Sequence, residues 1–280
     1  MRRRTFVAAG LAFAATPAWA ASSTGKDGRL VVKGAMEQGC LMLGYAEPQA
    51  SVRVDGKAVR LNEEGAFAFG FAFDQTKASI VSVTWGDGTV ETQSYMPAVR
   101  QYEIQRVEGL PQNTVTPPPE VLARIKAEAE AVYFARQRDT EGADFLSGFD
   151  WPAPGIESGV FGSQRIDNGV PMAPHFGVDM AAPIGTPIHA PASGVVSLSA
   201  DHYLNGGLTL IDHGQGVSTA YLHQSKRLVR VGDVVKRGQK IGEIGQTGRA
   251  TGPHLHWAMN WFEMRLDPSR STRKPKPDPL

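Results

Sequence analysis

Two short segments that lie far apart in the sequence carry side chains suited to holding one metal ion. They are His175-Phe-Gly-Val-Asp179 and His254-Leu-His256. On a β-strand, His254 and His256 point to the same face. An extended strand would hold His175 and Asp179 roughly 13 Å apart, too far for ligands bonded at about 2 Å, so the chain must bend at Gly177. Imidazole nitrogen and carboxylate oxygen are ligands that zinc prefers, so these segments are expected to meet in the fold.

A helix is the alternative way to place His175 and Asp179 on one face, because residues i and i+4 are neighbours on a helix. Pro174, Gly177 and Pro183 argue against a helix here. We therefore expect strands and turns around both segments.

The two segments belong to a series of landmarks that resembles the lysostaphin-like zinc peptidases, also called the LytM or M23 family. The other landmarks are, in order, Phe161-Gly-Ser-Gln-Arg165, Gly185-Thr-Pro-Ile-His-Ala190, Ile211-Asp-His-Gly214, Tyr221-Leu-His223 and Thr247-Gly-Arg-Ala-Thr-Gly-Pro-His254. The resemblance implies an antiparallel β-barrel or β-sheet peptidase domain over residues 149–270. It also implies one Zn²⁺ ion held by His175, Asp179 and His256, with His223 and His254 as the catalytic residues.

A catalytic zinc ion with three protein ligands leaves its fourth position to water, lowers the pKa of that water and polarises a substrate carbonyl. The sequence contains no His-Glu-x-x-His motif, so the general base of that larger peptidase class is missing. We expect the imidazoles of His223 and His254 to orient the water and stabilise the oxyanion, although the sequence does not divide these roles between them. We expect Arg165 and Asn205 to be exposed loop residues, with substrate contact as the alternative, and His213 to be a turn residue.

The region before the peptidase-like domain is predicted to contain a small β-sandwich over residues 28–105. Short alternating runs flank Asp55-Gly56 and Gly86-Asp-Gly88, which are strong hairpin signals. This pattern resembles the immunoglobulin-like modules of bacterial surface enzymes. A proline-rich linker with a helix follows over residues 106–148, where Leu122, Ile125, Ala129 and Val132 form an apolar stripe. Residues 271–280 are rich in lysine and proline and are expected to be a disordered tail.

The first twenty residues have the pattern of a signal peptide. Arg2, Arg3 and Arg4 precede a short apolar run, and Ala18-Trp-Ala20 fits a cleavage site. Arg3-Arg-Thr-Phe6 also resembles a twin-arginine motif, with an ordinary secretion signal as the alternative. Without these three arginines, the 29 Lys and Arg become 26 against 28 Asp and Glu, a net charge of −2. We therefore expect no nucleic-acid partner, no transmembrane segment in the mature chain, and a periplasmic or secreted location.

The family resemblance implies an exported zinc-dependent endopeptidase that hydrolyses peptide cross-links of peptidoglycan. Its binding partners would be stem peptides, and a periplasmic location favours the D-alanyl–diaminopimelate bond. The alternative is a non-catalytic or latent LytM-like regulator that binds a cell-wall amidase or another divisome partner. Some family members have lost their metal ligands, but every expected ligand is present here, and latency would need a segment such as residues 141–148 over the groove. A third hypothesis is a wall-binding module.

Overall fold

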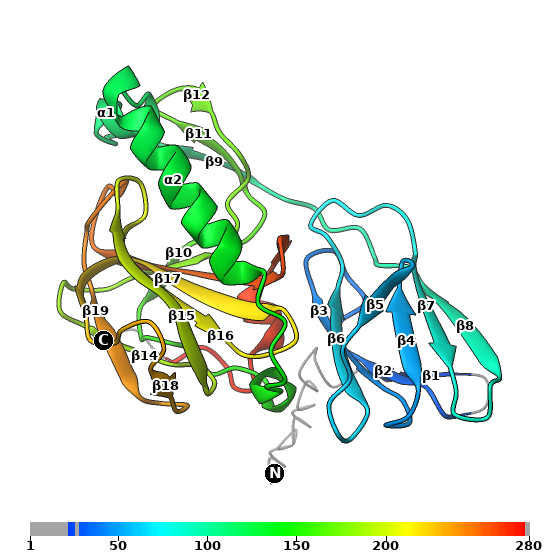
Figure 1. Ribbon diagram of the computed structural model, residues 1–280. Helices are drawn as coiled ribbons and strands as arrows, with labels where there is room; N and C mark the ends of the chain where they lie inside the picture. The colour runs from blue at the N-terminus through cyan, green and yellow to red at the C-terminus, as the bar shows by residue number, and fades with distance from the viewer. Residues whose placement is uncertain (1–21, 26–27, 278–280) are drawn as a thin grey trace, which may run out of the picture.

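The computed structural model describes residues 22–25 and 28–277 (Figure 1). The expected signal peptide over residues 1–20 lies outside these ranges. Within them, no helix has the length and apolar character needed to cross a membrane. The predicted mostly-β fold is confirmed, because nearly all the regular elements are strands and α2 is the only long helix among the described residues.

Two four-stranded antiparallel sheets form the N-terminal domain (Figure 1). The first sheet has the order β1 (Ser22–Thr24), β2 (Val31–Lys33), β3 (Leu41–Tyr45) and β6 (Ala66–Gly70). The second has the order β5 (Lys57–Val59), β4 (Ser51–Val54), β7 (Ser79–Thr84) and β8 (Val90–Tyr95). Both predicted hairpins are present, and Asp55 and Gly56 adopt positive φ angles of 50° and 78° in the turn between β4 and β5. The buried side chains of Phe67, Phe69 and Trp85 contribute to the apolar core of this domain.

The ten-stranded sheet of the C-terminal domain carries the metal-binding motifs. Its main path has the order β10 (Ile156–Gly159), β13 (Val178–Ala181), β20 (His254–Trp261), β17 (Val217–Arg227), β16 (Gly206–Asp212), β15 (Gly194–His202) and β18 (Val234–Val235). Off this path, β19 (Lys240–Ile244) pairs with β17 and with β14 (Pro187–His189), and β21 (Met264–Leu266) pairs with β20. The pairing of β13 with β20 brings the two predicted metal-binding segments together.

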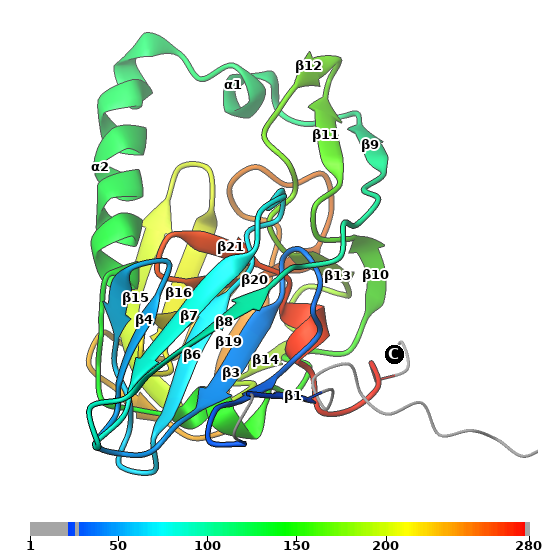
Figure 2. The same ribbon diagram turned by 90° about the vertical axis from the view of Figure 1, so that its right-hand side faces the viewer.

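The segment between the domains forms one long helix and one edge of a second, smaller sheet. Helix α2 (Pro119–Arg136) begins at the third of three consecutive prolines, as expected from the fit of proline to the first turn, and the short α1 (Gln112–Val115) precedes it. β9 (Ile104–Val107) pairs in parallel with β11 (Gln164–Asp167), which also pairs with β12 (Val170–Pro171). Figure 2 shows α2 and this three-stranded sheet on opposite sides above the main sheet, with α1 between them.

Helix α2 docks on the C-terminal domain through its last two turns. Ala135 and Val132 pack on an apolar cluster formed by the main sheet. The predicted stripe is therefore right at Val132 but wrong at Leu122, whose side chain is 51% exposed. The reason is that the first half of α2 extends beyond the cluster on which its second half packs.

The two domains share an apolar contact. Leu41 and Leu43 on β3 belong to the same cluster as Val178 and Leu266 of the C-terminal domain, whereas Met42 between them belongs to the N-terminal core. An ion pair reinforces the contact, because Arg100 Nη2 lies 2.9 Å from the buried carboxylate of Asp267. β3 is thus buried on both faces, and the two domains are packed together.

Residues 271–276, which we expected to be disordered, make defined contacts in the structure. The short helix η3 (Pro268–Ser271) is followed by Arg273, whose guanidinium donates to Asp150 at 2.8–3.0 Å. Lys276 Nζ lies 3.5 Å from Glu157. These contacts return the end of the chain to the beginning of the C-terminal domain, where a basic tail finds acidic partners.

His213 lies directly before a turn, close to the expected position, and its side chain is buried. Its Nδ1 lies 2.6 Å from the carbonyl oxygen of Ser193, and its Nε2 lies 2.7 Å from the hydroxyl of Thr219. The carbonyl requires Nδ1 to carry the proton, so Nε2 accepts from the hydroxyl. Burial lowers the pKa of His213 to about 4, so the imidazole is neutral in the folded protein at neutral pH.

We expect His213 to make the protein less stable in acid. An unfolded histidine titrates near 6.5, so between pH 6.5 and about 4 the unfolded state binds the additional proton. The stabilisation from His213 is complete above pH 6.5 and decreases as the pH falls, by about 2 kcal/mol between pH 7.5 and 5. Urea unfolding of wild type and His213→Ala at both pH values measures this term. His189→Gln is the control, and equal pH dependence of wild type and His213→Ala would contradict the assignment.

Candidate metal centre

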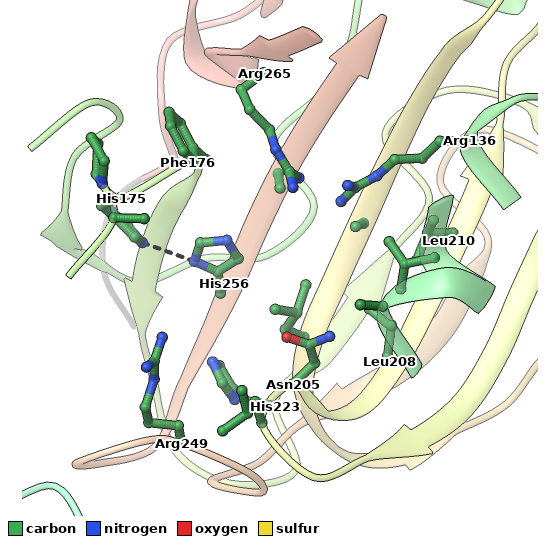
Figure 3. A pocket seen from close by; sticks show the side chains of 18 of the residues that line it. Arg136, His175, Phe176, Asn205, Leu208, Leu210, His223, Arg249, His256 and Arg265 are labelled. Atoms are coloured by element: carbon green, nitrogen blue, oxygen red, sulfur yellow. Dashed lines mark hydrogen bonds between the residues drawn. The ribbon is translucent and has the colours of Figure 1, made fainter. Parts of the chain in front are cut away.

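Three predicted ligands converge next to the paired strands β13 and β20. His175 Nε2 lies 3.0 Å from Asp179 Oδ1 and 2.8 Å from His256 Nδ1, and His256 Nδ1 lies 2.8 Å from Asp179 Oδ1. Within the described residues, this is the one group of three or more histidine, cysteine or acidic side chains with ligand atoms close enough to hold a metal ion. Figure 3 shows His175 next to His256, with a dashed line marking the contact between their ring nitrogens.

Strand register and a loop hold the ligands in place. Asp179 and His256 are direct partners across β13 and β20, so their side chains emerge side by side. His175 precedes β13, and its backbone pairs with residues 162 and 163 at 2.7 and 2.8 Å. The expected bend between His175 and Asp179 is present, because only Asp179 lies on the strand.

Two glycines leave room for the ligands. A Cβ atom at Gly177 would lie 2.5 Å from His256 Nε2, and one at Gly159 would lie 2.4 Å from Asp179 Oδ2. Gly177 is not among the residues with positive φ. The need for a glycine at this position is therefore explained better by the close approach of His256 than by the bend that we expected Gly177 to permit.

The donor set fits a small divalent cation. His175 Nδ1 lies 3.0 Å from the carbonyl oxygen of Val160, so Nδ1 carries the proton and Nε2 offers its lone pair to the centre. A tetrahedral ion with bonds of about 2.0–2.2 Å needs ligand atoms roughly 3.3 Å apart, which the three atoms reach by separating a few tenths of an ångström. A cation would satisfy all three ligand atoms of His175, Asp179 and His256 at once.

The carboxylate of Asp179 is ionised. Burial alone would raise the pKa of Asp179, but the contacts of its carboxylate with the imidazoles of His175 and His256 lower it well below its usual value. Arg165 Nη2 also donates to Asp179 Oδ2 at 2.5 Å. Arg165 therefore fixes one carboxylate oxygen and leaves Oδ1 for the centre. Burial, as the largest cause, lowers the pKa of His256 to about 4, which favours the neutral imidazole that binds metals.

The two predicted catalytic histidines lie next to the ligands. The ring centroid of His223 is 4.7 Å from that of His254 and 6.3 Å from that of His256. His254 Nε2 lies 3.9 Å from Asp179 Oδ1. Nδ1 of His223 faces the carbonyl oxygen of Thr247 at 2.8 Å, and Nδ1 of His254 faces that of Gly252 at 2.9 Å. Each neutral ring therefore carries its proton on Nδ1 and keeps Nε2 as an acceptor.

A backbone irregularity turns His223 toward the site. Consecutive residues of a regular strand point to opposite faces, yet Leu222 and His223 both line the same cleft. His223 has a φ of +63°, and the register of β17 is irregular on both sides of it. Its amide donates to Asn205 O at 2.9 Å, which helps hold this strained conformation. Burial, followed by repulsion from His254 and His256, lowers the pKa of His223 to about 3.

The sequence interpretation missed one residue of the centre. Arg165 contacts the ligand Asp179, whereas we expected an exposed loop residue without a role. Its position in the Phe161-Gly-Ser-Gln-Arg165 landmark was the available signal. Asn205 lines the cleft next to His223, so its contacts too are with the site.

The segment suggested as a cover for the groove lies elsewhere. None of residues 141–148 lines the cleft at the metal centre. Phe145 is buried in the core of the C-terminal domain, and the amide of Asp144 donates to His213 O at 3.1 Å. This segment therefore does not cover the centre in the structure.

Comparisons with known proteins agree on the region that contains the centre. Residues 173–268 match peptidase family M23. The chain is 50% identical over 88 residues to the peptidoglycan DD-endopeptidase ShyA of Vibrio cholerae serotype O1, which covers 31% of this chain and 20% of that protein. It is 45% identical over 83 residues to the DD-carboxypeptidase/endopeptidase Mpg of Neisseria gonorrhoeae. This match covers 30% of this chain and 19% of that protein. The matched region is thus about a fifth of the length of these curated relatives.

The similarity to a solved structure extends across both domains. A crystal structure from Pseudomonas aeruginosa, described as a peptidase M23, is similar over 86% of this chain and 92% of that chain. The sequence identity is 30%, and the TM-score is 0.64. The similarity therefore extends beyond the C-terminal domain into the N-terminal half of the chain.

Proposed function

This chain belongs to peptidase family M23, and we propose that it is a zinc-dependent endopeptidase that hydrolyses peptide cross-links of peptidoglycan. The observation that carries the proposal is the convergence of His175, Asp179 and His256 with two further histidines beside them. The names of the curated relatives support peptidoglycan as the substrate. A DD-endopeptidase cleaves an amide bond between two stereocentres of D configuration, and the D-alanyl–diaminopimelate cross-link is such a bond.

The protein's own residues would hold the ion and arrange the reactants. His175, Asp179 and His256 would bind one zinc ion, which supplies a Lewis acid for the scissile carbonyl and an acidified water. Two neutral imidazoles and one carboxylate leave the centre with a net charge of +1. Arg165 keeps Asp179 ionised and oriented by its contact with Oδ2.

The two other histidines would manage protons and charge. With Nδ1 bonded to a backbone carbonyl, His223 and His254 each present Nε2 toward the reacting atoms. Nε2 accepts a proton from the attacking water and, once protonated, stabilises the oxyanion or returns the proton to the leaving amine. The burial of His223 excludes competing solvent from this step. We assign His223 and His254 jointly to proton transfer and oxyanion stabilisation. Kinetic measurements would divide these roles between them.

Peptidoglycan lies outside the cytoplasm, so we propose that the protein acts there, in the periplasm. Residues 1–20 would provide export. No observation favours the regulator of amidases over the enzyme, because the complete donor set is present and residues 141–148 do not cover it.

Digestion of isolated sacculi tests the proposed function. We expect the mature wild-type protein with zinc to convert cross-linked muropeptides into uncross-linked ones, as measured by chromatography. We expect His254→Ala to convert none. His189→Gln, which alters a histidine on β14 away from the centre, is expected to behave as wild type. If wild type binds zinc and leaves cross-linking unchanged, the endopeptidase is rejected, and stimulation of a purified cell-wall amidase becomes the next assay.

A further inference from the structure

A cleft extends from the metal centre to the end of α2. Its volume is about 490 Å³. His175, His223 and His256 line one end, and Arg136 and Arg265 are also among its lining residues. Apolar side chains of the main sheet and α2 lie between them, namely Val132, Leu208, Leu210, Ala220, Leu222 and Ala258. The cleft therefore has a metal end, an apolar floor and an arginine end.

Arg136 is a buried cation whose guanidinium has no hydrogen-bond or ion-pair partner among the described residues. It is the last residue of α2, and only 8% of it is exposed. Its side chain forms no hydrogen bond and no ion pair with any residue that the structure describes. Burial, followed by repulsion from Arg265, lowers the pKa of Arg136 to about 9, and the attraction of Glu263 opposes this shift. A buried guanidinium without an ion pair or a hydrogen bond is costly to the fold.

Arg265 faces the same space from β21. Figure 3 shows the guanidinium groups of Arg136 and Arg265 pointing toward one another at the side of the cleft. Arg265 packs over the ring of Phe176 at 5.7 Å and makes one long contact with Asn260 Oδ1, at 3.4 Å. No carboxylate of the described chain lies within 4.0 Å of either guanidinium.

The other charged residues along the cleft have partners. Arg165 contacts Asp179, and Arg249 Nη1 lies 3.9 Å from Asp167. Glu263 is the one acidic residue at the arginine end, and its Oε1 accepts from Gln137 Nε2 at 3.2 Å. Two arginines against one glutamate leave a net positive charge at this end, so it lacks one anionic group.

We propose that Arg136 and Arg265 bind a carboxylate of the peptide substrate. This inference rests on the proposed function and names a binding group for that substrate. Two guanidinium forks that converge in a desolvated cleft suit a carboxylate, which accepts several charge-assisted hydrogen bonds at once. The carboxylate of the bound peptide supplies the anionic group that the arginine end of the cleft lacks.

The distance along the sheet suits a residue near the scissile bond. Arg265 is the partner of Asn260 across β20 and β21, and Asn260 lies four residues beyond His256. Those four residues span about 13 Å at their Cα atoms, and the long arginine side chains reach back over the apolar floor. A carboxylate bound there belongs to a substrate residue close to the reacting amide but separate from it.

Cross-linked stem peptides offer two carboxylates that fit this description. One is the free carboxylate of the diaminopimelate residue, and the other is a carboxylate at the C-terminal end of a stem. Four synthetic cross-linked dimers separate them, with both carboxylates free, with either one converted to the amide, or with both amidated. Amidation removes the negative charge and leaves the backbone unchanged.

We expect wild type to cleave the free dimer about 10- to 100-fold more efficiently, as kcat/KM, than the dimer whose recognised carboxylate is amidated. Arg136→Met and Arg265→Met are expected to remove this preference by losing activity on the free dimer and retaining it on the amide. Lys126→Gln is the matched control, because it removes a positive charge from an exposed position of the same helix. Arg136→Lys keeps the charge without the fork and is expected to restore the preference in part.

Separate readouts distinguish failure of the subsite from failure of the proposed function. Binding of the free and amidated dimers to zinc-free protein, measured by calorimetry, tests the arginines even if no dimer is cleaved. Equal affinity for free and amidated dimers in wild type would overturn the subsite. So would an equal loss on both dimers in a folded Arg265→Met variant, which would mark a structural role, and thermal unfolding checks that each variant is folded.

Discussion

Replacing His256 with alanine is expected to remove zinc from the purified protein and to lower kcat/KM on a cross-linked dimer at least about a thousandfold. His256 is the proposed ligand that joins the two distant segments, because its Nδ1 lies within 2.8 Å of both His175 Nε2 and Asp179 Oδ1. Without it, one imidazole and one carboxylate remain, and the site loses a ligand of its tetrahedral set. Metal analysis by mass spectrometry after gel filtration measures the first effect, and chromatography of the cleaved dimer measures the second.

His189→Gln is the control for His256→Ala, because it changes a histidine that is not near the centre. Zinc should also raise the unfolding temperature of wild type and of His189→Gln, and leave that of His256→Ala unchanged. Equal zinc content in wild type and His256→Ala would show that the ligand assignment is wrong.

Replacing His223 with asparagine is expected to leave zinc bound and to reduce kcat by about 100- to 10,000-fold. His223 lies beside the ligands without being one of them, and its Nε2 is free to exchange a proton. Asparagine is preferred to alanine because it tolerates the positive φ of +63° at this position, so the bulge in β17 should survive. Single-turnover cleavage and metal analysis of the same preparation separate rate from occupancy.

The contrast between the two variants is the decisive part of this experiment. His256→Ala should lose metal and rate together, and His223→Asn should lose rate alone. Loss of zinc from a folded His223→Asn variant would place His223 among the ligands, whereas an unchanged rate would remove it from the mechanism.

The candidate ligands could be named from sequence because their chemistry is local and their motifs are short, and the structure groups them. His254-x-His256 places two imidazoles on one strand face, and the structure has this strand. The meeting of β13 with β20 could not be derived from spacing and came from the family resemblance. His223 is a similar case, because regular alternation would point it to the same face as the buried Tyr221, and only the bulge turns it to the cleft.

Two other features were beyond sequence reasoning for a different reason. β3 has no alternation of polar and apolar residues, because one of its faces is buried in each domain, so its Leu41-Met-Leu-Gly-Tyr45 run carried no period of two. In the sequence, Arg136 is only a basic residue near the end of a predicted helix, where a cation is favourable. Its lack of a partner depends on how α2 lies over the sheet, which is a property of the tertiary structure alone.

The placement of α2 has a practical consequence for anyone who shortens this protein. A truncated form that starts at residue 149 would keep every ligand and both auxiliary histidines, yet it would lack Arg136 and uncover the apolar surface that Leu41 and Leu43 protect. Such a reagent would be prone to aggregate, and it would lack one of the two arginines of the proposed carboxylate subsite. Inhibitor screens and substrate profiling should therefore keep the N-terminal half.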